Sequence, residues 1–217
     1  MRTIKKVASH IFIDGFGGMT QGLFATLIIG TMIQQIGLLI GGSTGNVIYL
    51  LGKAAAALTS AGIGVGVAVK YGESPLVTVS AAVAAMVGGY AGKITGGTFF
   101  VDGNAVLAGP GEPLGAFIAA FAGITCGHLV SGKTKVDIIV TPVITIGAGS
   151  VVGLLVGPPI SQMMTGLGSI INWATEQRPF IMGIVVSVVM GMVLTLPISS
   201  AALGIILNLS GLAAGAA

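Results

Sequence analysis

The sequence predicts an all-α fold, a polytopic transmembrane helical bundle that forms a single membrane domain over residues 1–217. Only 7% of the residues are charged, whereas 54% are hydrophobic, and about a quarter of the residues in a soluble domain are charged. So few polar side chains cannot cover a surface that faces water. Runs such as Phe180–Leu196 are apolar on all sides, which favours membrane helices over the alternating strands of a barrel.

The first expected element is an amphipathic helix over residues 1–13, which can lie in the headgroup layer of an anionic leaflet. Its apolar residues recur at helical spacing, and its polar side carries Arg2, Lys5 and Lys6. The glycine-rich stretch "DGFGG", residues 14–18, is expected to end it. A signal peptide is the alternative interpretation, but the apolar stretch that begins at Met19 is too long for one.

About seven membrane spans are then expected, because a helix needs about 20 residues to cross a bilayer. The sequence predicts them at Met19–Ile40, Asn46–Val69, Ser74–Gly92, Pro113–Val130, Val136–Gly157, Phe180–Leu196 and from Ile198 onward. The last stretch has no charged or aromatic anchor at its end, so we expect the sequence to be truncated at its C-terminus.

The basic residues predict a cytoplasmic N-terminus, because positive charge concentrates in cytoplasmic loops. With this orientation six basic residues lie inside, namely Arg2, Lys5, Lys6, Lys70, Lys133 and Lys135, and two lie outside, namely Lys93 and Arg178. This distribution explains the high isoelectric point better than a nucleic-acid partner does.

Small residues recur every four positions within several expected spans. The ladders are Gly149–Gly153–Gly157, Ala119–Gly123–Gly127 and Gly88–Gly92. In lipid, where no hydrophobic force drives helices together, such ladders let helix backbones pack closely. We therefore expect close helix contacts along them.

Residues 158–179 predict an interfacial amphipathic helix that lies along the membrane surface. One helical face is apolar and the other is polar, prolines flank both ends, and Trp173 suits the headgroup zone. An ordinary extracellular loop helix is the alternative.

Residues 93–113, "KITGGTFFVDGNAVLAGPGEP", predict a re-entrant or gating segment on the outer side. Irregular backbone at membrane depth persists only where protein shelters it or where it lines a watery cavity. Pro113 suits the first position of the next helix, so Glu112 can cap that helix. Alternatively, Glu112 accepts hydrogen bonds from a solute, as in the broken helices of transporters. Both roles stay open, and Asp102 and Asn104 are further candidates for substrate binding.

No catalytic, metal or cofactor site is expected in this sequence. Cys126 and His128 lie two residues apart at a helix end and lack further ligands for a shared metal. No pairing of a nucleophile with a base and no phosphate-binding loop is found, so nothing indicates autonomous catalysis.

Three stretches resemble the IIC-type membrane component of the bacterial phosphotransferase system: "FIDGFGGMTQGLFATLIIGTMIQQIG" (12–37), "KYGESPLVTVSAA" (70–82) and "DGNAVLAGPGEPLGAFIAA" (102–120). More narrowly, they are similar to the branch of perfringolysin-regulator-like membrane proteins. The resemblance implies a homodimeric permease in the bacterial plasma (inner) membrane that binds a small polar solute, such as a sugar. A separate cytoplasmic IIB protein would phosphorylate that solute, and a separate IIA protein would supply IIB.

The sequence departs from its sugar-transporting relatives, which place a histidine and a glutamate in re-entrant hairpins of the later half. Here Glu112 comes early, and neither His10 nor His128 lies in a suitable segment. The alternative function is therefore a membrane-embedded regulator or sensor that keeps a permease-like fold and does not transport.

Overall fold

The computed structural model describes residues 10–107, 109–175, 183–184, 187–188 and 191–192. Nearly all of this part of the chain is helical. The π-helices are η1 His10–Gly15 and η2 Phe24–Ile28, and the strands are β1 Phe100–Val101 and β2 Asn104–Ala105. The α-helices are α2 Phe16–Leu23, α3 Ile29–Ile40, α4 Gly42–Ala57, α5 Thr59–Lys70, α6 Pro75–Gly89, α7 Ala91–Thr95, α8 Pro113–Val130 and α9 Asp137–Thr175.

Three of the described helices are long and apolar enough to cross a membrane: Ile13–Ile40, Pro113–Val130 and Asp137–Ala174. A fourth crossing results if α4 and α5, which meet at a bend of 53°, form one broken span. The seven expected spans are therefore not confirmed. Helix α6 has only 15 residues, and the two spans expected after residue 179 fall almost entirely outside the described residues.

The helix break expected at residues 14–18 is wrong, because the helix continues through them into α2. Gly15 has helical backbone angles, with φ −62° and ψ −53°. Gly18 lies directly against α5, where an added Cβ would come within 2.6 Å of the Gly66 carbonyl oxygen. Close packing thus explains this glycine. Residues 1–9 of the expected amphipathic helix lie outside the described residues.

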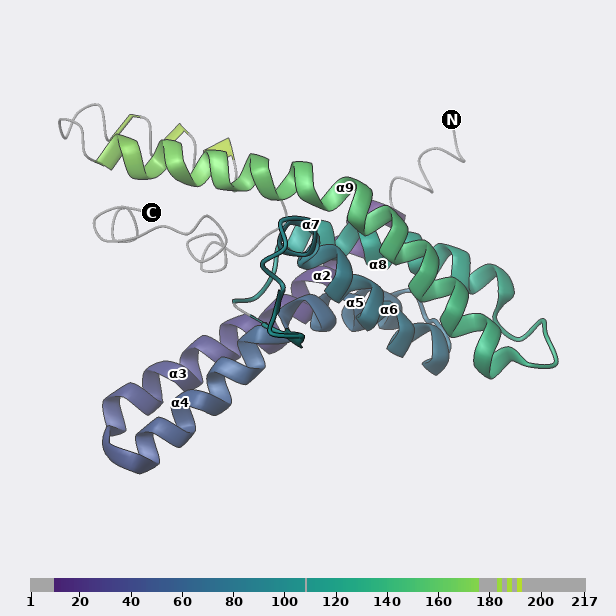
Figure 1. Cartoon of the computed structure of the whole chain (residues 1–217), viewed down its shortest axis with the longest axis horizontal. Coiled ribbons are helices and arrows are strands. Elements are labelled where there is room, and N and C mark those ends of the chain that lie inside the picture. Colours follow the sequence, from purple (N-terminus) through teal and green to yellow (C-terminus); the bar gives the residue numbers. More distant parts are fainter. Residues whose placement is uncertain (1–9, 108, 176–182, 185–186, 189–190, 193–217) are drawn as a thin grey trace.

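The first two long helical segments form an antiparallel hairpin, and glycines face each other along it. An added Cβ at Gly18, Gly22, Gly30 or Gly37 of the first segment would come within 2.8 Å of backbone atoms of the second segment. The glycines of the second segment that lie opposite these four are, in the same order, Gly66, Gly62, Gly52 and Gly45. The α3–α4 part of this hairpin extends away from the other helices, and the second half of α9 extends in another direction (Figure 1).

The small-residue ladders in α8 and α9 pack closely, as expected, whereas the Gly88–Gly92 pair is divided between α6 and α7. An added Cβ at Gly149 would lie 2.6 Å from the Ala119 carbonyl oxygen, and one at Gly153 would lie 2.8 Å from the Gly88 Cα. Helix α9 therefore lies close to α8 and α6. With α5 and α2, these helices enclose a centre of fully buried residues that includes Met19, Leu23, Ile63, Val67, Ala81 and Ala120.

Helix α9 differs from the expected arrangement of a span followed by a separate surface helix. It runs for 39 residues with Pro142, Pro158 and Pro159 inside it. Proline removes one backbone donor, which membrane helices tolerate where neighbouring groups satisfy the freed carbonyl. The segment from Pro158 therefore continues the helix. Its orientation along the membrane surface stays a prediction, and residues 176–179 lie outside the described residues.

Candidate functional site

The chain between α7 and α8 first forms a short exposed β-hairpin. Phe100 pairs with Ala105 and Val101 with Asn104. Asp102 and Gly103, the two turn residues, have φ values of +51° and +76°. Positive φ at both turn residues is the geometry of a type I′ turn, for which Asp-Gly is a favoured pair. This Asp-Gly pair is a local sequence signal for the hairpin, which the expectation of a re-entrant segment over residues 93–113 did not include.

The segment Gly109–Glu112 then packs between helices. The Ser60 hydroxyl of α5 donates to the Pro110 carbonyl oxygen at 2.9 Å, and the Tyr90 hydroxyl donates to the Gly109 carbonyl oxygen. The Glu112 amide donates to the Gly89 carbonyl oxygen at 2.7 Å. These bonds satisfy polar backbone groups that no helix satisfies. The irregular backbone of this segment is therefore sheltered by protein, whereas the hairpin before it is exposed. Entry of residues 93–113 into the membrane stays a prediction.

Gly111 is required by both its conformation and its surroundings. Its φ is +76°, a value that side-chain-bearing residues rarely adopt. An added Cβ would also lie 3.1 Å from the Gly89 carbonyl oxygen and 3.2 Å from the Tyr90 ring. The glycine thus lets the segment pass close to the end of α6.

Glu112 caps helix α8. Its backbone is extended, and Pro113 follows as the first helical residue. One carboxylate oxygen accepts from the Leu114 amide at 3.1 Å, and the other accepts from the Gly115 amide. Burial raises the pKa of Glu112, although these two bonds act to lower it. The capping role is therefore present in the structure, and it leaves part of the carboxylate's accepting capacity for another donor.

The structure does not bring the other two predicted site residues to Glu112. Asp102 and Asn104 lie in the exposed hairpin, and the Asn104 side-chain amide donates to the Asp102 carbonyl oxygen at 3.3 Å. Their observed contacts support the turn.

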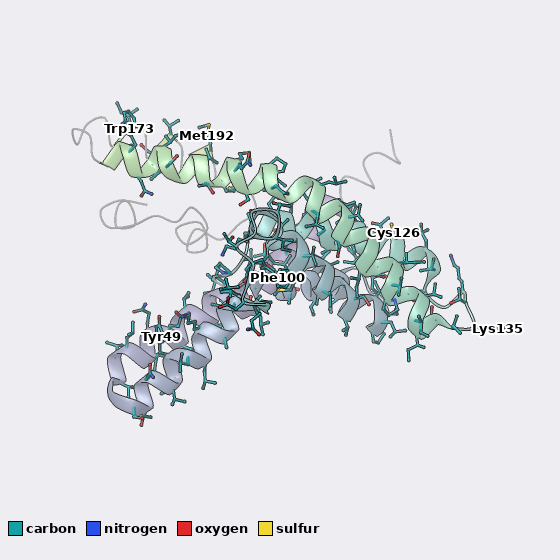
Figure 2. The ribbon with its side chains drawn as sticks, viewed as in Figure 1. Tyr49, Phe100, Cys126, Lys135, Trp173 and Met192 are labelled. Atoms are coloured by element: carbon teal, nitrogen blue, oxygen red, sulfur yellow. The ribbon has the colours of Figure 1, made fainter. Side chains whose placement is uncertain are left out.

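Aromatic side chains connect the hairpin to the end of α6. The ring centroids of Tyr90 and Phe99 lie 5.3 Å apart, and those of Phe99 and Phe100 lie 4.9 Å apart. The Lys93 ammonium lies 5.5 Å from the centre of the Tyr90 ring. Phe100 lies near the point where the α3–α4 hairpin leaves the bundle in the view of Figure 2, whereas Trp173 lies towards the far end of α9.

A cavity of about 450 Å³ lies between α7 and α9. Its lining includes the hydroxyls of Thr95, Ser161 and Thr165 and the carboxamide of Gln162, and no charged side chain of the described residues lines it. Gly92, which also lines the cavity, lies three residues after Gly89, the acceptor for the Glu112 amide. The sequence pattern places residues 161, 162 and 165 on the polar face of the expected surface helix, and it does not predict a binding role for them.

Other candidate chemistry is limited within the part of the chain that the structure describes. No group of three or more His, Cys, Asp or Glu side chains could hold a metal ion there. His128 pairs with Glu73, with Nδ1 3.0 Å from a carboxylate oxygen.

The model of one protein family, described as "Phosphotransferase system, EIIC", matches residues 13–217 of the chain. No curated protein and no solved structure matches the chain.

Proposed function

The chain belongs to the phosphotransferase system EIIC family, and from this premise we propose that it carries a small polar solute, such as a sugar, across the membrane. Membership makes it a membrane protein and a permease-like component that works with other components of this system. The nature of the solute and the residues that bind it are our proposal.

The observation that carries the proposal is the packed non-helical segment that ends at Glu112. Transporters place solute sites where a helix is interrupted, because the ends of the broken helix present unpaired polar groups. Here Ser60, Gly89 and Tyr90 hold the interruption against α5 and α6. Glu112 lies at its end, as a half-buried residue.

The cavity between α7 and α9 supplies space for the solute, and Gly92 in its lining lies three residues after Gly89, which accepts from the Glu112 amide. Its volume is within the range of about 300–1,000 Å³ that is usual for small-molecule sites. Hydroxyl and carboxamide groups can both donate to and accept from solute hydroxyls. We propose that Ser161, Gln162 and Thr165 bind the solute together with Glu112, which accepts from a solute hydroxyl. Asp102 and Asn104 stay proposed solute-binding residues only because a carboxylate and a carboxamide can bind solute hydroxyls.

The proposed partners follow from the family. A separate IIB protein would transfer a phosphoryl group to the bound solute, and the role of this chain would be to position the accepting hydroxyl, since phosphoryl transfer depends chiefly on positioning and charge stabilisation. We further propose a homodimer in the bacterial plasma membrane with the N-terminus in the cytoplasm, in accord with the distribution of basic residues.

The proposal is tested with the purified chain in detergent and in proteoliposomes that contain a phosphorylated IIB protein. A panel of sugars and polyols is screened for a rise in melting temperature, because a ligand that binds the folded state stabilises it. We expect at least one of them to raise the melting temperature and to accumulate as its phosphate. The double variant Ser161→Ala, Thr165→Val should lower the affinity about tenfold or more.

The matched control is Thr78→Val, which removes a hydroxyl of α6 that donates to the carbonyl oxygen of Ser74, the residue that caps the same helix. It should leave the affinity unchanged. A panel in which no sugar or polyol stabilises the protein or accumulates would reject the proposed function.

A further inference from the structure

A second cavity, of about 430 Å³, lies against the opposite end of α8 from Glu112. Tyr71 and Glu73 line it from the turn between α5 and α6. The side chains of Phe121, Ile124, Thr125, His128 and Leu129 line it from α8. The cavity is therefore mostly apolar, and the Glu73 carboxylate and the His128 imidazole both belong to its lining.

The turn holds Glu73 in a defined position. Gly72 has a φ of +70°, and the Glu73 amide donates back to the Ala68 carbonyl oxygen at 3.0 Å, which ends α5. The next residue, Ser74, caps α6, and its hydroxyl lies 3.0 Å from the hydroxyl of Ser131 after α8. These hydrogen bonds attach the turn to both α5 and α8, and they therefore hold Glu73 in a defined position.

Glu73 is nearly buried, and its histidine partner is exposed. The Glu73 side chain is 9% exposed, whereas that of His128 is 71% exposed. The His128 Nδ1 lies 3.0 Å and 3.2 Å from the two carboxylate oxygens. A neutral imidazole can donate this one hydrogen bond and leave the pair with a net charge of −1. A carboxylate has about four accepting positions, so Glu73 retains capacity for a further donor.

The rest of the lining favours a cation with an apolar portion. The rings of Tyr71 and Phe121 meet edge to face, with centroids 6.3 Å apart, and Phe121 stacks on Phe117. Aromatic faces attract ammonium groups. No lysine or arginine of the described residues lines the cavity. Burial, followed by the nearby Asp14 carboxylate, raises the pKa of Tyr71 to about 12, so Tyr71 contributes a neutral aromatic ring to the lining.

We propose that this cavity binds a ligand that carries a primary or methylated ammonium group, with the ammonium on the Glu73 carboxylate and the apolar part against Phe121 and Leu129. The ammonium group can belong to a soluble amine or to the headgroup of a membrane lipid. The site is separate from the proposed solute site at the other end of α8, and it does not depend on the proposed function.

The test compares charged ligands with uncharged ligands of similar shape on the full chain. In detergent, the melting temperature is measured against ethanolamine and choline, with ethylene glycol as the uncharged counterpart. In nanodiscs, phosphatidylethanolamine is compared with phosphatidylglycerol. We expect the ammonium compounds in one or both formats to stabilise the protein, and their uncharged or anionic counterparts not to do so.

Two variants separate ligand binding from folding. Glu73→Gln removes the carboxylate, and His128→Gln removes the ion pair but keeps the carboxylate. We expect Glu73→Gln to weaken ammonium binding about tenfold or more and His128→Gln to retain it. Asp102→Asn, which removes an exposed acid in the distant hairpin, controls for the change in net charge and should also retain it.

Each outcome of these measurements either supports the proposal or contradicts it. Loss in Glu73→Gln with soluble amines identifies a soluble ligand, and loss only with phosphatidylethanolamine identifies a lipid; both support the proposal. Equal ammonium binding by the wild type and Glu73→Gln, or no preference for ammonium compounds in either format, would overturn it. Sugar binding is measured on the same preparations, so failure of this proposal is distinguished from failure of the proposed function.

Discussion

The Ser60 hydroxyl and the Pro110 carbonyl oxygen lie 2.9 Å apart although the two residues are 50 positions apart in the chain. Ser60 is fully buried in the second position of α5, just after the bend that separates α4 from α5. This bond attaches the non-helical segment before α8 to the point where the long hairpin changes direction. The two irregular features of the fold therefore support each other.

Removal of this bond should destabilise the protein measurably. Ser60→Ala leaves the Pro110 carbonyl without its donor, and a lost hydrogen bond of this kind costs about 1–3 kcal/mol. The melting temperature in detergent should fall. Tyr90→Phe removes the other hydroxyl that holds the segment, at Gly109. Because both bonds hold one segment, the double variant should lose less than the two single variants predict together. Strict additivity would show that the two bonds act independently.

Gly111→Ala should cost more stability than Gly109→Ala. Both glycines have positive φ, +76° and +81°. An alanine at either position should therefore lower the free energy of unfolding by about 1–2 kcal/mol, because it must adopt a left-handed backbone. An added Cβ at Gly109 meets nothing within 4 Å, whereas one at Gly111 meets the Gly89 carbonyl oxygen at 3.1 Å. Thermal unfolding of the two variants measures the difference. Equal losses would mean that close packing does not matter at position 111.

Glycine packing in the first hairpin should be sensitive to a single methyl group. At Gly30 an added Cβ would lie 2.8 Å from both the Ala56 nitrogen and the Gly52 carbonyl oxygen, which are backbone atoms. Gly30→Ala should therefore destabilise the protein by about 1–3 kcal/mol, as overpacking does. Gly147→Ala in α9 is the control, since nothing lies within 4 Å of its added Cβ, and it should be neutral or stabilise by about 0.5–1 kcal/mol.

The stability of the folded protein should depend on the titration of Glu112. Burial raises the pKa of Glu112 above its ordinary value of 4.5, so the folded state binds this proton more tightly than the unfolded state. The contribution is fully present below pH 4.5 and is lost as the pH rises through 4.5 towards the raised pKa. Melting temperatures between pH 4 and pH 7 should therefore fall more steeply for the wild type than for Glu112→Gln. Parallel profiles would indicate that the pKa is not raised.

The start of α8 could be predicted from sequence because its determinants are adjacent. Pro113 lacks an amide donor and Glu112 supplies an acceptor, so both the helix start and the cap follow from two neighbouring residues. The close packing of the Gly149 ladder followed in the same way from spacing within one helix. Local patterns of this kind can be recognised in a sequence without knowing which helices pack against each other.

The features of the fold and of the site that could not be predicted depend on contacts between segments that are distant in the chain. Neither Ser60 nor Tyr90 belongs to a recognisable motif, and their partners become apparent only when α5, α6 and the segment before α8 are brought together. Gly15 and Gly18 were interpreted as helix breakers, but they are helical, and Gly18 lies where the neighbouring α5 leaves no room for a side chain. Pro158 and Pro159 were expected to lie at the start of a separate surface helix, but α9 continues through them.

The central claim, that Glu112 binds solute in addition to capping α8, is tested most directly by the affinity for the stabilising sugar or polyol. Glu112→Gln is compared with Asp137→Asn, since Asp137 also accepts hydrogen bonds at a helix start, from the Gly132 amide at 2.9 Å and the Thr141 hydroxyl at 2.6 Å. Both variants should lose a similar degree of thermal stability. We predict that only Glu112→Gln lowers the solute affinity, by about tenfold or more, whereas an unchanged affinity in Glu112→Gln would contradict the account and leave Glu112 as a helix cap alone.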